Sequence, residues 1–163
     1  MMEPPMSEDH ELIMLSYTSI ASHLMTHEEL IQLLHQAREN NHKRGITGML
    51  LYMEGCFFQV LEGDRAVLET LYIKIGQDKR HHHVIKLLEE PIMTRGFDAW
   101  SMGYRHVTRE DLVQETGLTD FLDKEESGFD GMHSEHARAL ISAFRQGRWQ
   151  TQNTRQYRYV SLV

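Results

Sequence analysis

Cysteine is nearly absent from this sequence, since Cys56 is the only one among 163 residues. A single cysteine excludes an internal disulfide framework and is typical of a reducing compartment, so we expect a cytoplasmic protein. Proline is scarce as well: two of the three prolines lie in the polar stretch Met1–His10, which we interpret as a flexible arm. Apolar runs long enough to cross a membrane are missing, and no signal peptide is visible, so we expect no membrane partner.

Positive charge is also in short supply, because 17 Lys and Arg stand against 24 Asp and Glu, which gives a net charge of −7. This balance argues against a general nucleic-acid binder. Walker, GxGxxG, GxSxG and zinc patterns are missing, and no nucleophile–base constellation is recognisable, so we do not expect catalytic turnover. The histidine run His81–His83 has the spacing of no defined metal site, and we predict that it binds no metal.

The stretch ITGMLLYMEGCFFQVLEG, from Ile46 to Gly63, contains two short apolar runs around Glu54 and Gly55. This pattern predicts two antiparallel strands joined by a tight turn. Gln59 interrupts the second run, and a buried carboxamide without partners costs about 1–3 kcal/mol. Either a polar group faces Gln59 inside the domain, or Gln59 bonds a neighbouring backbone group or points to water.

The segment Leu12–Thr18 predicts a first strand in which Ile13, Leu15 and Tyr17 share one face. Taken alone, Tyr17 is explained as a core residue whose hydroxyl reaches the surface.

A capping box at Thr26 and Glu29 predicts a helix that runs to about Asn40. Asn40 and Asn41 then have two explanations. They end the helix, as asparagine often does, or they form a pair of carboxamides that can bind a ring offering both C=O and N–H groups.

The remaining elements are a helix that opens after Asp64, strands at Val84–Glu90 and Phe97–Tyr104, and a separate helix at Ser134–Arg145. The order βαββαββ up to Tyr104 predicts an α+β fold of the ferredoxin-like sandwich type, with one sheet and two helices on one of its faces. We therefore divide the chain into three parts, which are the arm at 1–10, a domain at 11–105, and a C-terminal helical extension with a tail at 106–163.

Five sequence blocks between Leu12 and Tyr104 share their order and spacing with a known family. They read SYTS, ENNHKRGITGML, GCFFQVLEG, QDKRHHHV and RGFDAWSMGY. In these blocks the chain resembles the BLUF family, blue-light sensors that use FAD. The resemblance implies an FAD cofactor and a photosensor without catalytic turnover. It implies a homo-oligomer or a downstream regulatory protein as the receiver of the signal, and no direct nucleic-acid partner.

The resemblance also implies a role for each matching position. Tyr17 corresponds to the electron-donor tyrosine, and Gln59 to the glutamine that switches between this tyrosine and the flavin. Trp100 and Met102 correspond to the pair on the last strand whose surroundings change on signalling. The residues expected to contact the cofactor are Tyr17, Asn40, Asn41, Ile46, Leu50, Gln59, Lys74, Ile75, Asp78 and His81. A flavin-free interaction module or a small enzyme on the same scaffold is the alternative.

Overall fold

The computed structural model describes residues 11–97, 103–106, 108, 129 and 132–145. The predicted arm at 1–10, the pair Trp100 and Met102, and most of the predicted extension lie outside these residues. The elements in chain order are β1 (Leu12–Ala21), α1 (His27–Arg44), β2 (Thr47–Met53), β3 (Cys56–Asp64), α2 (Arg65–Gln77), β4 (His81–Pro91), β5 (Gly103–His106) and α5 (Ser134–Arg145).

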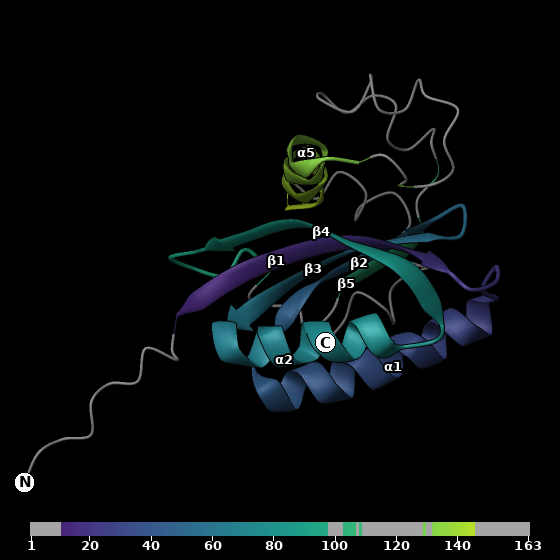
Figure 1. Ribbon diagram of the computed structural model, residues 1–163, viewed down its shortest axis with the longest axis horizontal. Coiled ribbons are helices and arrows are strands. Elements are labelled where there is room, and N and C mark those ends of the chain that lie inside the picture. Colours follow the sequence, from purple (N-terminus) through teal and green to yellow (C-terminus); the bar gives the residue numbers. More distant parts are fainter. Residues whose placement is uncertain (1–10, 98–102, 107, 109–128, 130–131, 146–163) are drawn as a thin grey trace, which may run out of the picture.

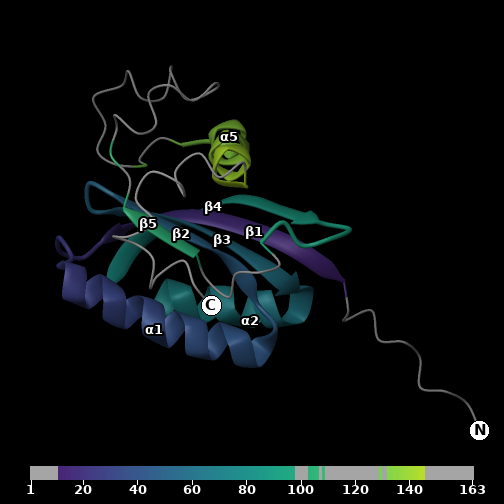
Figure 2. The same cartoon turned by 180° about the vertical axis from the view of Figure 1, so that it is seen from behind.

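The strands form one five-stranded sheet in the order β4-β1-β3-β2-β5. The four strands β1 to β4 pair antiparallel, and β5 joins β2 in parallel at the other edge. Figures 1 and 2 show α1 and α2 on one face of this sheet and α5 on the opposite face. The predicted α+β ferredoxin-like sandwich is confirmed, and α5 adds a third layer to it.

Side chains alternate between two buried clusters, as the period-two pattern of strands requires. On β1, Ile13, Leu15 and Tyr17 face the helices α1 and α2, whereas Met14 belongs to the cluster on the α5 side. On β3, Phe57 and Leu61 face α1 and α2, and Cys56, Phe58 and Val60 face α5. The sheet is therefore buried on both faces, which explains why its central strands read as nearly continuous apolar runs.

Helix α1 begins as predicted but ends later. The hydroxyl of Thr26 accepts a hydrogen bond from the Glu29 N–H at 3.2 Å, which is half of the expected capping box. The interpretation of Asn40 and Asn41 as a helix stop is wrong, because both lie within α1. The helix ends only at Gly45, whose left-handed φ of 66° is the usual conformation at this position.

Strand β4 is longer than predicted and starts in the histidine run, at His81. It pairs with β1 through two register shifts, one between Ser16 and Tyr17 and one between Thr18 and Ile20. His83 lies at the second shift with a positive φ of 55°, which is uncommon for a residue other than glycine. Two β-bulges therefore flank the pairing position of Tyr17.

The predicted strand Phe97–Tyr104 is wrong at its start and confirmed at its end, and residues 98–102 lie outside the described part of the chain. Phe97 lies in a bend, and the described part of the last strand, β5, begins at Gly103. The backbone N–H of Phe97 donates a hydrogen bond to the carboxylate of Glu62 on β3. This bond to a side chain attaches Phe97 to the sheet.

Helix α5 packs against the sheet through Ala137, Leu140 and Ile141, three buried apolar residues whose spacing places them on one helix face. At its outer side, Arg138 forms a bidentate ion pair with Glu90 of β4, with N–O distances of 3.1 and 2.7 Å. The sheet thus buries the apolar face of this helix. Within the described part of the chain, no helix has the length and hydropathy to span a membrane.

Candidate functional site

A row of three residues crosses the sheet on the face that carries α1 and α2. Tyr17 on β1 is opposite Gln59 on β3, and Gln59 is opposite Leu50 on β2. All three are buried, with exposed fractions of 4, 7 and 4%. The hydroxyl of Tyr17 donates a hydrogen bond to Oε1 of Gln59. Of the explanations open for Gln59, the structure therefore supports the one in which a polar group inside the domain faces it.

Above this row lies a cavity of about 280 Å³ between the sheet and the two helices. Its wall includes apolar side chains from β2, β3, α1 and α2, and carboxamide and charged side chains. The lining residues are Tyr17, Leu33, Gln36, Ala37, Asn40, Asn41, Arg44, Leu50, Phe57, Gln59, Leu61, Leu71, Lys74, Ile75, Asp78, Arg80 and His81.

Helix α1 presents a polar stripe to this cavity. Gln36, Asn40 and Arg44 follow one another at intervals of four residues, so they share one helix face. Asn41 lies beside them and is the only one of the four that is buried, with 3% of its surface exposed. Because the helix continues past both asparagines, their carboxamides face the cavity from a regular scaffold and not from a loop.

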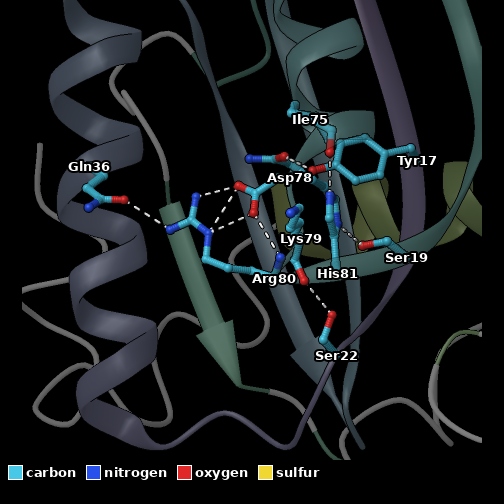
Figure 3. A network of polar contacts seen from close by, with 10 residues as sticks. Tyr17, Ser19, Ser22, Gln36, Ile75, Asp78, Lys79, Arg80 and His81 are labelled. Carbon is cyan, nitrogen blue, oxygen red and sulfur yellow. Dashed lines mark hydrogen bonds and ion pairs between the residues drawn. The ribbon is translucent and has the colours of Figure 1, made fainter.

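His81 lies at the start of β4, next to Tyr17, with 6.3 Å between the ring centroids. Its Nε2 is 2.6 Å from the carbonyl oxygen of Ile75, and its Nδ1 is 2.7 Å from the Ser19 hydroxyl (Figure 3). A carbonyl only accepts, so Nε2 carries the proton, and in the neutral ring Nδ1 accepts from Ser19. Both ring nitrogens thus tie the end of α2 to β1.

Arg80 joins the two helices at the exposed end of the cavity. Its guanidinium donates to Asp78 at distances of 2.5 to 3.0 Å and to Oε1 of Gln36 at 3.0 Å (Figure 3). The hydrogen bond from Arg80 is the main reason why the pKa of Asp78 lies below its ordinary value. Together with Lys74 and Arg44, this leaves three cationic groups and one carboxylate at the solvent side of the cavity.

The Tyr17 phenol is held in its neutral form. Burial raises its pKa well above the ordinary value, and the neighbouring Tyr72 and Asp78 add to the effect. A phenol in this environment keeps its proton throughout the physiological pH range. Its hydrogen bond to Gln59 consequently has a defined direction, with Tyr17 as the donor.

The cavity gathers nearly all predicted cofactor contacts. Nine of the ten line it, and the exception is Ile46, which is buried in the cluster on the same face of the sheet. Trp100 and Met102 lie outside the described residues. The sequence reasoning missed three polar residues of this site, Gln36, Arg44 and Arg80. The spacing of Gln36 to Asn40 was a usable signal for the first, whereas Arg80 is recognisable only through its contacts in the fold.

The lining fits the isoalloxazine ring and phosphates of a flavin. The three carboxamides at Asn40, Asn41 and Gln59 match the alternating C=O and N–H groups of the polar ring edge. Leu50 and Ile75 provide apolar contacts for a flat ring system. Pockets for small molecules usually have volumes from about 300 Å³ upward. The cavity, with about 280 Å³, is therefore large enough for the ring system alone. The cationic groups of Lys74, Arg44 and Arg80 at the solvent side would suit the phosphates of such a cofactor.

Comparison with known proteins gives a consistent result. The BLUF family, described as "Sensors of blue-light using FAD", matches residues 12–103. Among curated proteins, the photoactivated adenylate cyclase subunit alpha of Euglena gracilis is 37% identical over 114 residues, which are 70% of this chain and 11% of that protein. The chain thus spans about a ninth of the length of this relative.

Two solved structures resemble the fold over most of its length. The dark-state structure of the BLUF protein BlrB has a TM-score of 0.63 and 31% identity, and the match covers 83% of this chain and 98% of that chain. The ground state of BlsA has a TM-score of 0.69 and 26% identity, with 82% of this chain and 87% of that chain covered.

Proposed function

The chain belongs to the BLUF family of blue-light sensors, and we propose from this premise that it binds FAD and switches through Tyr17 and Gln59. The observation that supports this most directly is the hydrogen bond from the buried Tyr17 hydroxyl to the Gln59 carboxamide, at the floor of a cavity lined by Asn40 and Asn41. A phenol and a carboxamide in contact provide an electron donor and a group with two distinct hydrogen-bonding ends.

A bound flavin would absorb the light and, while excited, would accept an electron from the Tyr17 phenol. Return of the electron and of the phenol proton would leave the flavin oxidised, with only the arrangement of Gln59 changed. Tyr17 is suited to give this electron because its phenol becomes strongly acidic when it is oxidised. The phenol then releases the proton that it holds in the dark. That proton has one path along a defined bond, from Oη of Tyr17 to Oε1 of Gln59. Since burial keeps the phenol protonated in the dark, proton release is coupled to light and not to pH.

Gln59 supplies the two arrangements that a switch requires. In the arrangement seen here, its oxygen accepts from Tyr17. A half-turn of the carboxamide, or its tautomerisation, places a donor at this position and reverses the direction of the bond. Each arrangement offers a different group to the cavity, so light alters the populations of two states of one hydrogen-bond network.

The proposed cofactor contacts divide into three groups. Asn40, Asn41 and Gln59 bind the polar edge of the ring. Leu50, Ile75 and Ile46 shape the apolar surroundings, with Ile46 in the layer behind the lining. The cationic groups of Lys74, Arg44 and Arg80 favour the phosphates, and the ion pair with Asp78 holds Arg80 in place. The two phosphates of FAD would interact with these cationic groups, whereas riboflavin has no phosphate.

We propose that the output is a change in binding and not catalysis by the matched domain. The relative from Euglena gracilis is named as a photoactivated adenylate cyclase, and in the present chain the corresponding receiver is a regulatory protein or a second copy. Trp100 and Met102, on the segment between Phe97 and β5, are proposed to sense the state of Gln59.

A visible spectrum of the purified chain tests this function. We expect oxidised flavin absorption, with a reversible red shift under blue light that decays in the dark. Extraction and chromatography of the cofactor then separate FAD from FMN and riboflavin. Absence of flavin after reconstitution would instead favour a flavin-free interaction module, and bound flavin without a reversible shift would contradict the proposed photochemistry.

A further inference from the structure

Glu62 is a fully buried carboxylate on the face of the sheet opposite the cavity. It lies three residues after Gln59 on β3, so the alternation of the strand directs its side chain to the α5 side. Its neighbours on that face, such as Phe58 and Val60, are apolar. A buried carboxylate is costly unless it is well hydrogen-bonded, and Glu62 does not line the flavin cavity. The proposed photochemistry therefore does not explain this residue.

The carboxylate of Glu62 accepts hydrogen bonds from two other parts of the chain. Oε2 accepts from the Gly96 N–H at 2.7 Å, and Oε1 accepts from the Phe97 N–H at 2.9 Å. The Thr47 hydroxyl on β2 donates to Oε1 at 3.0 Å. Hydrogen bonds to a carboxylate are shorter and stronger than those between neutral groups. Glu62 thus attaches the bend at Gly96 and Phe97 to β3, the central strand of the sheet.

Arg95 reinforces this attachment. Its Nη1 donates to the Thr47 hydroxyl at 2.9 Å and to the backbone carbonyl of Glu62 at 3.0 Å. Three consecutive residues, Arg95 to Phe97, are consequently bound to one pair of opposed residues on β2 and β3, namely Thr47 and Glu62. We call these five residues the Glu62 clamp.

Phe97 connects the clamp with the α5 layer. Its backbone is bound to Glu62, while its side chain is buried, 3% exposed, in the cluster that also contains Leu140 and Ile141 of α5. Further along the chain, Gly103 pairs with Met49 of β2. The segment that leads into the last strand is thus anchored at both ends, by the clamp before it and by β5 after it.

We propose that Glu62 is a positioning residue for signal output, which links the strand of Gln59 through Phe97 to the core beneath α5. This inference rests on the proposed light-sensing function. It assigns to β3 two different tasks on its two faces: Gln59 responds to the flavin, and Glu62 holds the start of the output segment against the same strand. A shift of β3 at Gln59 then displaces Phe97, and with it the packing of α5.

The test compares wild type with Glu62→Gln, each as the full chain loaded with flavin. Hydrogen exchange of individual amides is measured in the dark and in the light, together with the red shift of the same sample. In wild type, light should change the protection of Phe97 and of amides in α5. Glu62→Gln should keep the normal red shift, exchange at Gly96 and Phe97 about tenfold faster in the dark because the charged acceptor is lost, and lose most of the light response in α5.

Glu90→Gln is the matched control, because Glu90 is also a carboxylate that contacts the α5 layer, through Arg138, but is not part of the clamp. It should keep the light response at Phe97. If Glu62→Gln does not fold, Thr47→Val decides the question, because it removes the hydroxyl between Arg95 and Glu62 and preserves the side-chain volume. The same loss of the α5 response is then expected.

Three results would overturn the proposal. They are a Glu62→Gln variant with an unchanged α5 response, one that binds flavin without the red shift, and a wild type whose red shift leaves Phe97 and α5 unchanged. The absence of any red shift in wild type is a different failure, since it contradicts the light-sensing function on which the proposal rests.

Discussion

The two faces of the sheet are built from the same strands but organised in opposite ways. On the side of α1 and α2, a cavity of about 280 Å³ is lined with carboxamides, charged groups and the Tyr17 phenol. On the α5 side, the ring centroids of Phe58 and Phe129 are 5.9 Å apart, and a pocket lined by Cys56 and Phe129 has a volume of only about 10 Å³. One face leaves space for a ligand, and the other is filled by the chain itself.

Alternation along β3 shows how a single strand serves both faces. Phe57 and Gln59 face the cavity, while Phe58 and Glu62 face α5. Residues adjacent in sequence thus have different tasks, and a change at one position acts on one face first. This comparison can be tested by substitutions that affect either the photochemistry or the stability of the fold.

The largest effect is expected for Gln59→Leu, which should bind flavin and lose the light-induced red shift entirely. Leucine keeps the approximate bulk but has no donor or acceptor for Tyr17. Gln36→Leu is the matched control, since Gln36 also lines the cavity but contacts Arg80 and not Tyr17. Absorption difference spectra measure the outcome, and a normal red-shifted state in Gln59→Leu would contradict the assigned role.

Tyr17→Phe should likewise retain flavin and lose the normal red shift, because no oxidisable phenol remains at the floor of the cavity. Tyr52→Phe provides the control. Tyr52 is also buried on this face, but it does not line the cavity, and its hydroxyl accepts a hydrogen bond from the Met25 N–H at 3.1 Å. A wild-type shift in Tyr17→Phe would remove Tyr17 from the mechanism.

The α5 side should show the reverse behaviour. Phe58→Ala is expected to lower the free energy of unfolding by about 3–5 kcal/mol, the usual cost of a large cavity in a close-packed core. The red shift of the remaining folded protein should be normal. Phe57→Ala, one residue earlier, should instead enlarge the flavin cavity and weaken flavin retention. Urea denaturation and flavin titration of both variants measure the effects on stability and on flavin binding. Equal flavin affinities for the two variants would contradict the division of tasks between the two faces.

Asn41→Ala should weaken flavin binding by about 1–3 kcal/mol, or roughly 5- to 150-fold, because a polar group of the ring is left without its partner. Glu39→Ala, two residues earlier on the exposed side of α1, should leave the affinity unchanged. Fluorescence titration with FAD gives both values. Equal affinities for the two variants would remove Asn41 from the contacts of the cofactor.

The smallest effect concerns pH. The native state raises the pKa of Tyr17 by burial, whereas the unfolded chain ionises this phenol near its ordinary pKa of about 10. Stability from the neutral phenol is therefore complete below pH 10 and is lost as the pH rises above it, at about 1.4 kcal/mol per pH unit at most. Unfolding of wild type and Tyr17→Phe between pH 9 and 11 should show a steeper loss in wild type, and parallel curves would contradict the assigned burial.

Local pattern was sufficient for most elements of the fold. The alternation in β1 and the N-cap at Thr26 have short-range causes, and both are present in the structure. The length of α1 is different, because Asn41 is buried against the rest of the domain, and tertiary packing overrides its weak helix propensity. Gly45, not the asparagines, supplies the left-handed conformation that ends the helix.

The site was predictable where a residue was unusual in its own segment, as Gln59 is in an apolar strand. It was not predictable where the partner is distant in sequence. Arg80 contacts Gln36 across 44 positions, and Glu62 contacts Phe97 across 35. Such contacts depend on the arrangement of whole elements, so neither residue differs in sequence from an ordinary surface Arg or Glu.

The bulged strand β4 forms one edge of the sheet, and this position has a consequence for solubility at high concentration. An open strand edge is a template on which another chain can add a strand, which is how aggregation often starts. The two register shifts and the left-handed His83 interrupt the regular row of edge N–H and C=O groups. Lys86 and Glu89 add opposite charges on this strand. The irregularity beside Tyr17 thus protects the protein from edge-to-edge association.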